Sequence, residues 1–203
     1  MNKEEFSPLH MEIVEDMVLE SLSKAASSME QMLKIRVRPK VTGFGLGPLR
    51  PLREFDDLGR FKVNLMKVEF KGEINGALYF VINVHEMDLI NRVVLGEDFV
   101  TTRGSESKMM KHDFMSEIEN LISNQSIAAL SEFLGVQVIP EVPLIRNMRG
   151  DLVNDYLENE NEQIDTRFYV KSLLTGVVVN ISPHFLWLID ENFIRISRLN
   201  IVT

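Results

Sequence analysis

The sequence predicts a mixed fold of long helices and turn-connected strands that is built from two related halves. Each half has a long helix, a strand that contains a proline, an irregular loop, and then two strands joined by a tight turn. The pattern Asp-x-x-x-Glu-x-x, followed by Ser or Asn, recurs in both long helices, and "VRPKV" recurs as "VIPEV" in the strand that follows each one. We interpret these features as an internal duplication within one domain, with repeats at about residues 7–96 and 107–196.

The first half is expected to contain two helices and three strands. Apolar residues recur near 3.6-residue spacing in its first helix, and the Asn75-Gly76 pair is typical of a tight turn between strands. In order, the expected elements are a helix from Ser7 to about Lys34, a strand from Ile35 to Val41, a glycine- and proline-rich loop to Gly59, strands from Phe61 to Phe70 and from Asn75 to Val84, and a helix from His85 that ends at Gly96.

The second half repeats this order around a longer helix. The helix is expected from about Ser107 to Leu134, and Gly135 ends it because glycine adopts the left-handed conformation that closes many helices. The remaining expected elements are a strand from Val136 to Val142, a polar loop from Arg146 to Asp165, and two strands, "TRFYVKSLL" and "GVVVNISPHFLWLID", that divide at Thr175-Gly176.

The composition is that of a globular protein and disfavours several classes of function. The chain has 203 residues, a formal charge of −8 and no cysteine. The negative charge argues against non-specific nucleic-acid binding, which depends on Lys and Arg contacts to phosphate. The absence of cysteine excludes a disulfide, a thiol nucleophile and a Cys-based zinc site. No signal-peptide region and no apolar run of about 18 residues is present, so we expect a cytoplasmic protein without a membrane span.

Familiar catalytic motifs are also missing from the sequence. The four histidines are scattered without metal-binding spacing, and there is no P-loop, GxSxG elbow or dinucleotide fingerprint. The glycine-rich stretch from Gly43 to Pro51 favours a loop over a phosphate cradle, because no helix start with a lysine follows it. We therefore expect no metal and no cofactor bound by the chain itself.

The long helix of the second half carries an unusual line of polar residues. At about 100° per residue, Asp113, Glu117, Asn120 and Asn124 fall within an arc of about 60°. A solvated helix face would also produce such a line. Asparagine is a poor helix former, however, and a solvated face gains nothing from two of them.

A glutamate and an asparagine one turn apart are suited to phosphoryl or acyl-phosphate hydrolysis. A carboxamide both donates and accepts hydrogen bonds and stays neutral, so it can orient a water molecule without titrating. Catalysis of phosphoryl transfer consists mainly of positioning the nucleophile and balancing charge. A nearby carboxylate can pair with a cation on the substrate. An exposed site of this kind would suit a phosphate carried by another protein.

These residues resemble the signature of the CheC, CheX and FliY phosphatases of bacterial chemotaxis. The pattern is Asp113-x-x-x-Glu117-x-x-Asn120, followed by the 22 residues 121–142 and then Pro143. The segments "SNQSIAALSEFLGVQV" and "VEFKGEINGALYFVINVHEMDLINRVVLG" also resemble this family, in which internal duplication is common. The resemblance covers most of the chain from about Val14 to Asp190.

The resemblance implies both a fold and an activity. The implied fold is a CheC-like, pseudo-twofold α+β domain with an extended antiparallel sheet and two long related helices. The implied activity is that of a hydrolase in two-component signalling, which removes phosphate from the aspartate of a CheY-type response regulator. Asn120 would orient the attacking water and Glu117 would bind the regulator's lysine. Asp113, Asn124 and Pro143 would be flanking partner contacts, and Mg²⁺ would belong to the regulator.

The first half departs from this signature. Asp16 and Glu20 are present, but Ser23 replaces the amide, and a hydroxyl cannot span the same donor and acceptor geometry. The 22 residues that follow Ser23, 24–45, lead to Leu46 rather than to a proline. We therefore expect a degenerate second site, although Ser23 would also fit a neutral helix surface. One intact motif points to CheX, whereas the chain length and the complete first helix resemble CheC.

A second hypothesis is an interaction module without catalysis. Such a protein would be a chemotaxis or flagellar-switch scaffold, or a binder of the deamidase CheD, acting as a monomer or a homodimer. The intact Glu117 and Asn120 favour the enzyme, because a scaffold has no need of the amide.

Overall fold

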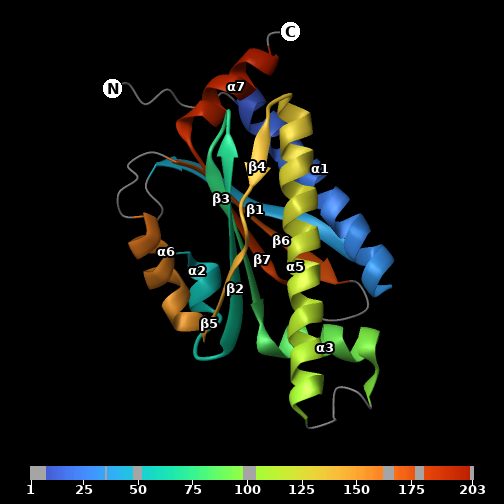
Figure 1. Ribbon diagram of the computed structural model, residues 1–203. Coiled ribbons are helices and arrows are strands. Elements are labelled where there is room, and N and C mark those ends of the chain that lie inside the picture. Colours follow the sequence, from blue (N-terminus) through green and yellow to red (C-terminus); the bar gives the residue numbers. More distant parts are fainter. Residues whose placement is uncertain are drawn as a thin grey trace.

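A single antiparallel sheet forms the centre of the molecule (Figure 1). The computed structural model describes residues 8–34, 36–47, 52–97, 104–161, 167–176 and 181–201. The strands are β1 (Val37–Gly47), β2 (Lys62–Gly72), β3 (Gly76–Asn83), β4 (Val138–Pro140), β5 (Leu144–Arg149), β6 (Arg167–Gly176) and β7 (His184–Ile189). Their order is β1-β6-β7-β3-β2-β4, and β5 also pairs with β2. The α+β class predicted from the sequence is confirmed.

The order of the strands is symmetric about the central pair β7 and β3. On one side, β6 and then β1 follow β7; on the other, β2 and then the edge strands β4 and β5 follow β3. Strand β1 of the first half pairs with β6, in the β6–β7 hairpin of the second half. Strands β4 and β5 of the second half pair with β2, in the β2–β3 hairpin of the first half. This exchange ties the two halves into one sheet. The repeat boundaries at 7–96 and 107–196 stay a prediction.

Helices cover both faces of the sheet (Figure 1). The helices are α1 (Pro8–Leu33), α2 (Arg53–Asp56), α3 (Val84–Leu95), α5 (Ser105–Leu134), α6 (Val153–Asn161) and α7 (Glu191–Ile201), with a 3₁₀ turn at Gly150–Leu152. The long helices α1 and α5 pack against each other and cover one face, and α2 and α6 lie on the other. Two long related helices were expected from the sequence.

Alternation along the strands explains why both faces are buried. On β2, Met66, Val68 and Phe70 belong to the core beneath α1 and α5. Val63 and Leu65, which precede Met66 and point to the opposite face, belong to a second core beneath α2 and α6. Because successive side chains of a strand point to opposite faces, one strand supplies both cores. The sheet is therefore a rigid platform for α5.

Several of the described segments differ from the elements expected from the sequence: α2 lies in the expected loop to Gly59, and the strands expected at 136–142 and 176–190 form as the shorter β4 and β7. Strand β1 continues through the glycine-rich stretch to Gly47, because that stretch pairs with β6 after an irregularity between Val41 and Gly43. The stretch expected as a loop from Arg146 to Asp165 contains the end of β5, the 3₁₀ turn and α6. Helix α7 was not expected at all. Residues 48–51, 98–103, 162–166 and 177–180 lie outside the described residues.

Candidate functional site

The polar line of α5 lies on the outer side of that helix. Asp113, Glu117 and Asn124 are exposed and Asn120 is half-buried. Helix α5 ends at Gly135, which has φ 64° and ψ 30° and donates its backbone N–H to the carbonyls of Ser131 and Glu132. The left-handed conformation that the sequence predicted for this glycine is thus present. The four polar side chains share one regular helix, so their spacing is preserved in the fold.

The opposite side of α5 is buried against the sheet. Ile118 and Ile122 are fully buried, as expected from their spacing, whereas Met110 is 48% exposed. The structure adds Met115 to the buried stripe. This packing leaves the polar line at the surface because the two stripes occupy opposite sides of the helix.

A buried carboxyl lies directly behind the polar line. Glu119 has no exposed surface, and its Oε1 accepts a hydrogen bond of 2.6 Å from Nδ2 of Asn64 on β2. Burial raises the pKa of the Glu119 carboxyl to about 7, and the hydrogen bond from Asn64 opposes that shift. Sequence reasoning missed this pair. The available signal was the position of Glu119 four residues after Met115, on the stripe that packs on the sheet.

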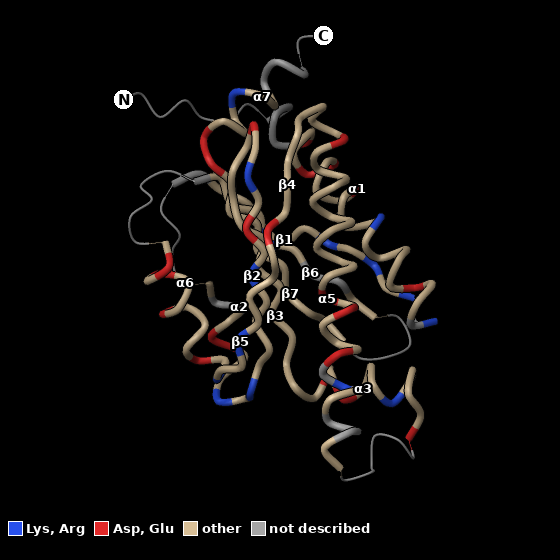
Figure 2. Tube along the Cα trace, viewed as in Figure 1, with Lys and Arg blue, Asp and Glu red and all other residues tan. Residues whose placement is uncertain are grey.

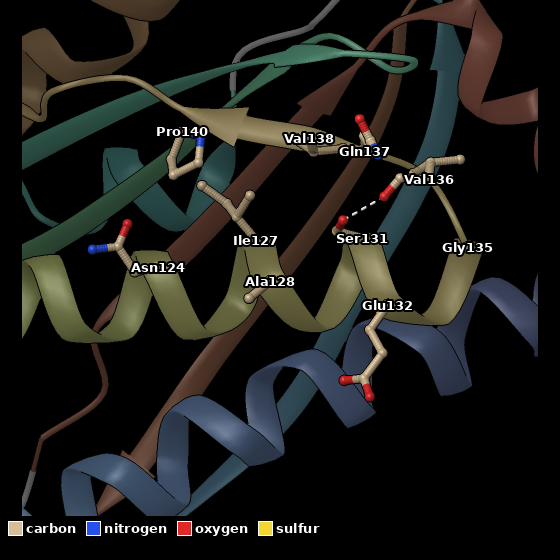
Figure 3. A pocket seen from close by; sticks show the side chains of 10 residues that line it. All are labelled: Asn124, Ile127, Ala128, Ser131, Glu132, Gly135, Val136, Gln137, Val138 and Pro140. Atoms are coloured by element: carbon tan, nitrogen blue, oxygen red, sulfur yellow. Dashed lines mark hydrogen bonds between the residues drawn. The ribbon is translucent and has the colours of Figure 1, made fainter.

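A groove separates the C-terminal half of α5 from β4 (Figure 3). Its volume is about 600 Å³, and Asn124 stands at one end, facing Pro140 across the gap. The Oγ of Ser131 donates a 2.5 Å hydrogen bond to the carbonyl of Val136, which closes the other end. The groove therefore continues the polar line toward the edge of the sheet. Its lining residues are Asn124, Ile127, Ala128, Ser131, Glu132, Gly135, Val136, Gln137, Val138 and Pro140.

Pro143, the last member of the sequence motif, lies in the short connection between β4 and β5. It is half-buried, and its neighbours Val142 and Leu144 are exposed. Val142, at 89% exposure, is the more exposed of these neighbours. Both strands are at the edge of the sheet and pair with β2, so Pro143 marks the point where the edge strand is interrupted.

The corresponding line on α1 is also at the surface but is engaged differently. Asp16, Glu20 and Ser23 are exposed. The Oγ of Ser23 donates a 2.6 Å hydrogen bond to the carbonyl of Leu19 in its own helix. Lys24 lies 3.8 Å from Glu20 and pairs at 2.6 Å with Glu132 of α5. The hydroxyl and the carboxylate of this line are thus occupied by neighbouring groups.

Acidic positions occur along the N-terminal half of α5, where Asp113, Glu117 and Glu119 are found (Figure 2). Within the part of the chain that the structure describes, no three His, Asp or Glu side chains gather in a way that could hold a metal ion. No described helix is long and apolar enough to cross a membrane.

Comparison with solved structures identifies the fold. FliY from Thermotoga maritima matches with a TM-score of 0.71 at 13% identity, covering 95% of this chain and 96% of that one. The FliM middle domain from Vibrio alginolyticus matches with a TM-score of 0.56 at 10% identity, covering 88% and 92%. CheX in the CheX–CheY–BeF₃–Mg²⁺ complex from Borrelia burgdorferi matches with a TM-score of 0.51 at 16% identity, covering 86% and 98%.

The chain has the CheC-like fold. The resemblance that the sequence motif predicted is confirmed at the level of the fold. No protein-family model and no curated protein sequence matches the chain. The CheC-like fold occurs both in chemotaxis proteins and in the FliM middle domain, so function has to be argued from the side chains of α5.

Proposed function

We propose that this chain is a cytoplasmic phosphatase that hydrolyses the aspartyl-phosphate of a CheY-type response regulator. The observation that carries the proposal is the pair of exposed Glu117 and half-buried Asn120, one turn apart on a long helix of a CheC-like fold. A CheX of the same fold has been seen in complex with CheY. We propose in addition that the regulator is phosphorylated and that Glu117 and Asn120 act on it.

The proposed chemistry uses the neutral amide of Asn120. Its oxygen accepts a hydrogen bond from the water and its nitrogen donates one to a phosphoryl oxygen, so the water is held in line with the phosphorus–oxygen bond. The water oxygen attacks phosphorus, the bond to the aspartyl oxygen breaks, and inorganic phosphate and a free carboxylate result. Mg²⁺, held by the regulator, would balance the phosphoryl charge. The chain itself then contributes only position.

Glu117 is proposed to bind the lysine of the regulator. Its carboxylate is exposed and lies three residues before Asn120, on the same side of α5. By pairing with the lysine one helical turn from Asn120, the Glu117 carboxylate would orient the regulator so that the Asn120 amide reaches the phosphoryl group. Asp113 and Asn124 flank the pair along α5. From Asn124 the regulator's surface would extend toward Pro143 across that end of the groove, away from Glu132, which lies at the other end and points toward α1 (Figure 3). The line on α1, with Ser23 in place of the amide, is proposed to be inactive.

The experiment that tests the proposal measures phosphate release from a phosphorylated CheY-type regulator, with and without the chain. Wild type is expected to accelerate the release. Glu117→Ala is expected to raise the regulator concentration needed for half-maximal rate by about tenfold, because one partner of a charge pair in the interface is lost.

Glu132→Ala is the matched control for this variant. It removes an exposed carboxylate from the same helix but from outside the polar line, where Glu132 pairs with Lys24. The control is expected to keep the concentration dependence of wild type. Equal effects of the two substitutions would show that Glu117 acts only through the net charge of the helix.

A second candidate function is a non-catalytic flagellar-switch scaffold or a CheD-binding module. The matches to FliY and the FliM middle domain favour it. A wild-type chain that binds the regulator but leaves its rate of phosphate loss unchanged would support the scaffold and refute the enzyme.

A further inference from the structure

A carboxyl and an amide meet inside the core where α5 packs on β2. Glu119 is 0% exposed and Asn64 is 4% exposed. Each interrupts an apolar stripe, since Asn64 precedes Met66 on its face of β2 and Glu119 follows Met115 on α5. The Nδ2 of Asn64 donates a 2.6 Å hydrogen bond to Oε1 of Glu119. Two polar groups placed at one apolar contact are therefore matched to each other.

The remaining atoms of this pair indicate which form of Glu119 the core accepts. Among the described residues, Oε2 of Glu119 and Oδ1 of Asn64 have no hydrogen-bond partner. Both are acceptors while the carboxyl is ionised. A proton on Oε2 would make that atom a donor, and Oδ1 is the unpartnered acceptor of the same amide that already binds Oε1. The neutral acid would form two hydrogen bonds with the amide, whereas the carboxylate forms one.

Among the described residues, no cation compensates the carboxylate of Glu119. Burial is the dominant effect on the pKa of Glu119, which it raises to about 7, and only the hydrogen bond from Asn64 opposes it. An unpaired charge in an apolar core is unfavourable. The charged side chains of the neighbouring elements do not contribute to the raised pKa of Glu119. These side chains are Lys62 and Lys67 on β2, Arg146 and Arg149 on β5, Glu20 and Lys24 on α1, Glu86 and Arg92 on α3, and Asp113 and Glu117 on α5 itself.

The same helical turn carries Asn120. Ser123 Oγ donates a hydrogen bond of 2.5 Å to the carbonyl of Glu119 and one of 3.4 Å to the carbonyl of Asn120. Asn120 therefore shares its backbone contacts with the buried residue. If Glu119 ionises and draws water toward its carboxylate, this turn has to move away from β2, and the amide of Asn120 moves with it.

We propose that Glu119 is a positioning residue: its protonated carboxyl, paired with Asn64, holds the turn of α5 that carries Asn120 against β2. Loss of this proton allows the turn to move away from β2. The structural part of the proposal stands on the buried pair. Its consequence for catalysis rests on the proposed function. The chain would accordingly be most active below neutral pH and less active above it.

The direction of the pH dependence follows from the shift. The folded pKa is higher than the unfolded one, so the folded chain keeps a proton that the unfolded chain releases. The contribution of Glu119 to the free energy of unfolding is fully present below about pH 4.5. It is lost as the pH rises from there to about 7. Over that interval this one group lowers the folding equilibrium constant by about two orders of magnitude.

Glu119→Gln tests the proposal because glutamine reproduces the neutral acid. Its Oε1 accepts from Asn64 Nδ2, and its Nε2 donates to Asn64 Oδ1. The carboxyl ¹³C resonances and the side-chain amide of Asn120 are followed by NMR from about pH 5 to about pH 9. We expect one wild-type carboxyl to titrate near neutrality, the Asn120 amide to shift with the same midpoint, and both transitions to be absent in Glu119→Gln. Glu132→Gln, an exposed change on the same helix, is the matched control and should retain both.

The catalytic consequence is measured as the ratio of wild-type to Glu119→Gln phosphate release, which cancels the regulator's own pH dependence. This ratio should fall by about tenfold between about pH 6 and about pH 8. A Glu119 carboxyl that titrates like exposed glutamates, or one that titrates near neutrality without any change at Asn120, would overturn the proposal. If no release occurs at any pH, the proposed function fails, whereas the two NMR titrations still decide this inference.

Discussion

Replacing Asn120 by alanine is expected to lower the rate of accelerated phosphate release by about 10²-fold or more, because preorganised polar groups of this kind contribute that much to catalysis. The methyl group that remains can neither accept a hydrogen bond from the water nor donate one to the phosphoryl group. Single-turnover decay of a phosphorylated regulator, mixed with excess chain, measures the effect. Binding of the regulator should persist because Glu117 is intact.

The corresponding position of the Asp16, Glu20 and Ser23 line on α1 supplies the matched control. Ser23→Ala truncates the corresponding position of α1, where the hydroxyl is already bonded to the carbonyl of Leu19, and it should leave the decay rate unchanged. Thermal unfolding should be similar for both variants, since Asn120 is only half-buried and Ser23 is exposed. Wild-type decay in the Asn120→Ala protein would refute the role of the amide and favour the scaffold.

Replacing Trp187 by alanine is expected to lower the free energy of unfolding by about 3–5 kcal/mol, the range for truncating a large buried aromatic residue. Trp187 is 1% exposed on β7, pairs with Leu78 of β3 and Val170 of β6, and meets the ring of Phe70 edge-on at 6.3 Å. Its loss leaves a cavity beneath the two long helices. Denaturant unfolding followed by circular dichroism measures the change, because the variant lacks the chain's single tryptophan.

Trp187→Phe separates the cavity from the loss of the indole. The indole Nε1 is buried without a hydrogen-bond partner among the described residues, so phenylalanine removes an unsatisfied donor while keeping most of the ring volume. Its cost should be much smaller than that of alanine. Equal costs would show that the indole N–H, rather than packing, stabilises this position.

The main elements of the fold are predictable where local patterns are strong. The spacing of apolar residues predicted α1 and α5 to within about two residues, and Gly96 and Gly135 correctly marked helix ends. For α3, the structure adds a capping box between Asn83 and Glu86 that extends the expected helix by one residue. Trp187 lies in the apolar strand segment "HFLWLI" and is buried.

Other elements depend on partners distant in the sequence. The glycine-rich part of β1 becomes a strand because β6 pairs with it. Strand β5 is mostly exposed and, among the described strands, pairs with β2 alone, so its sequence lacks the alternation typical of a half-buried strand. Helix α6 is rich in Asn and acidic residues. It is stabilised by burial of Val153 and Leu157 in the second core and by bonds from Asn154 to Leu52.

The candidate site, too, has one part that the sequence predicts and one part that depends on distant partners. The sequence alone determined that Asp113, Glu117, Asn120 and Asn124 share one face of a helix, because a regular helix converts residue spacing directly into a shared face. It also predicted the fold, through the repeated motif and its proline. Only the tertiary structure decided what lies behind that line. Asn64 and Glu119 are 55 positions apart, and they meet in an apolar core only because α5 packs on β2. Burial at this contact raises the pKa of the Glu119 carboxyl.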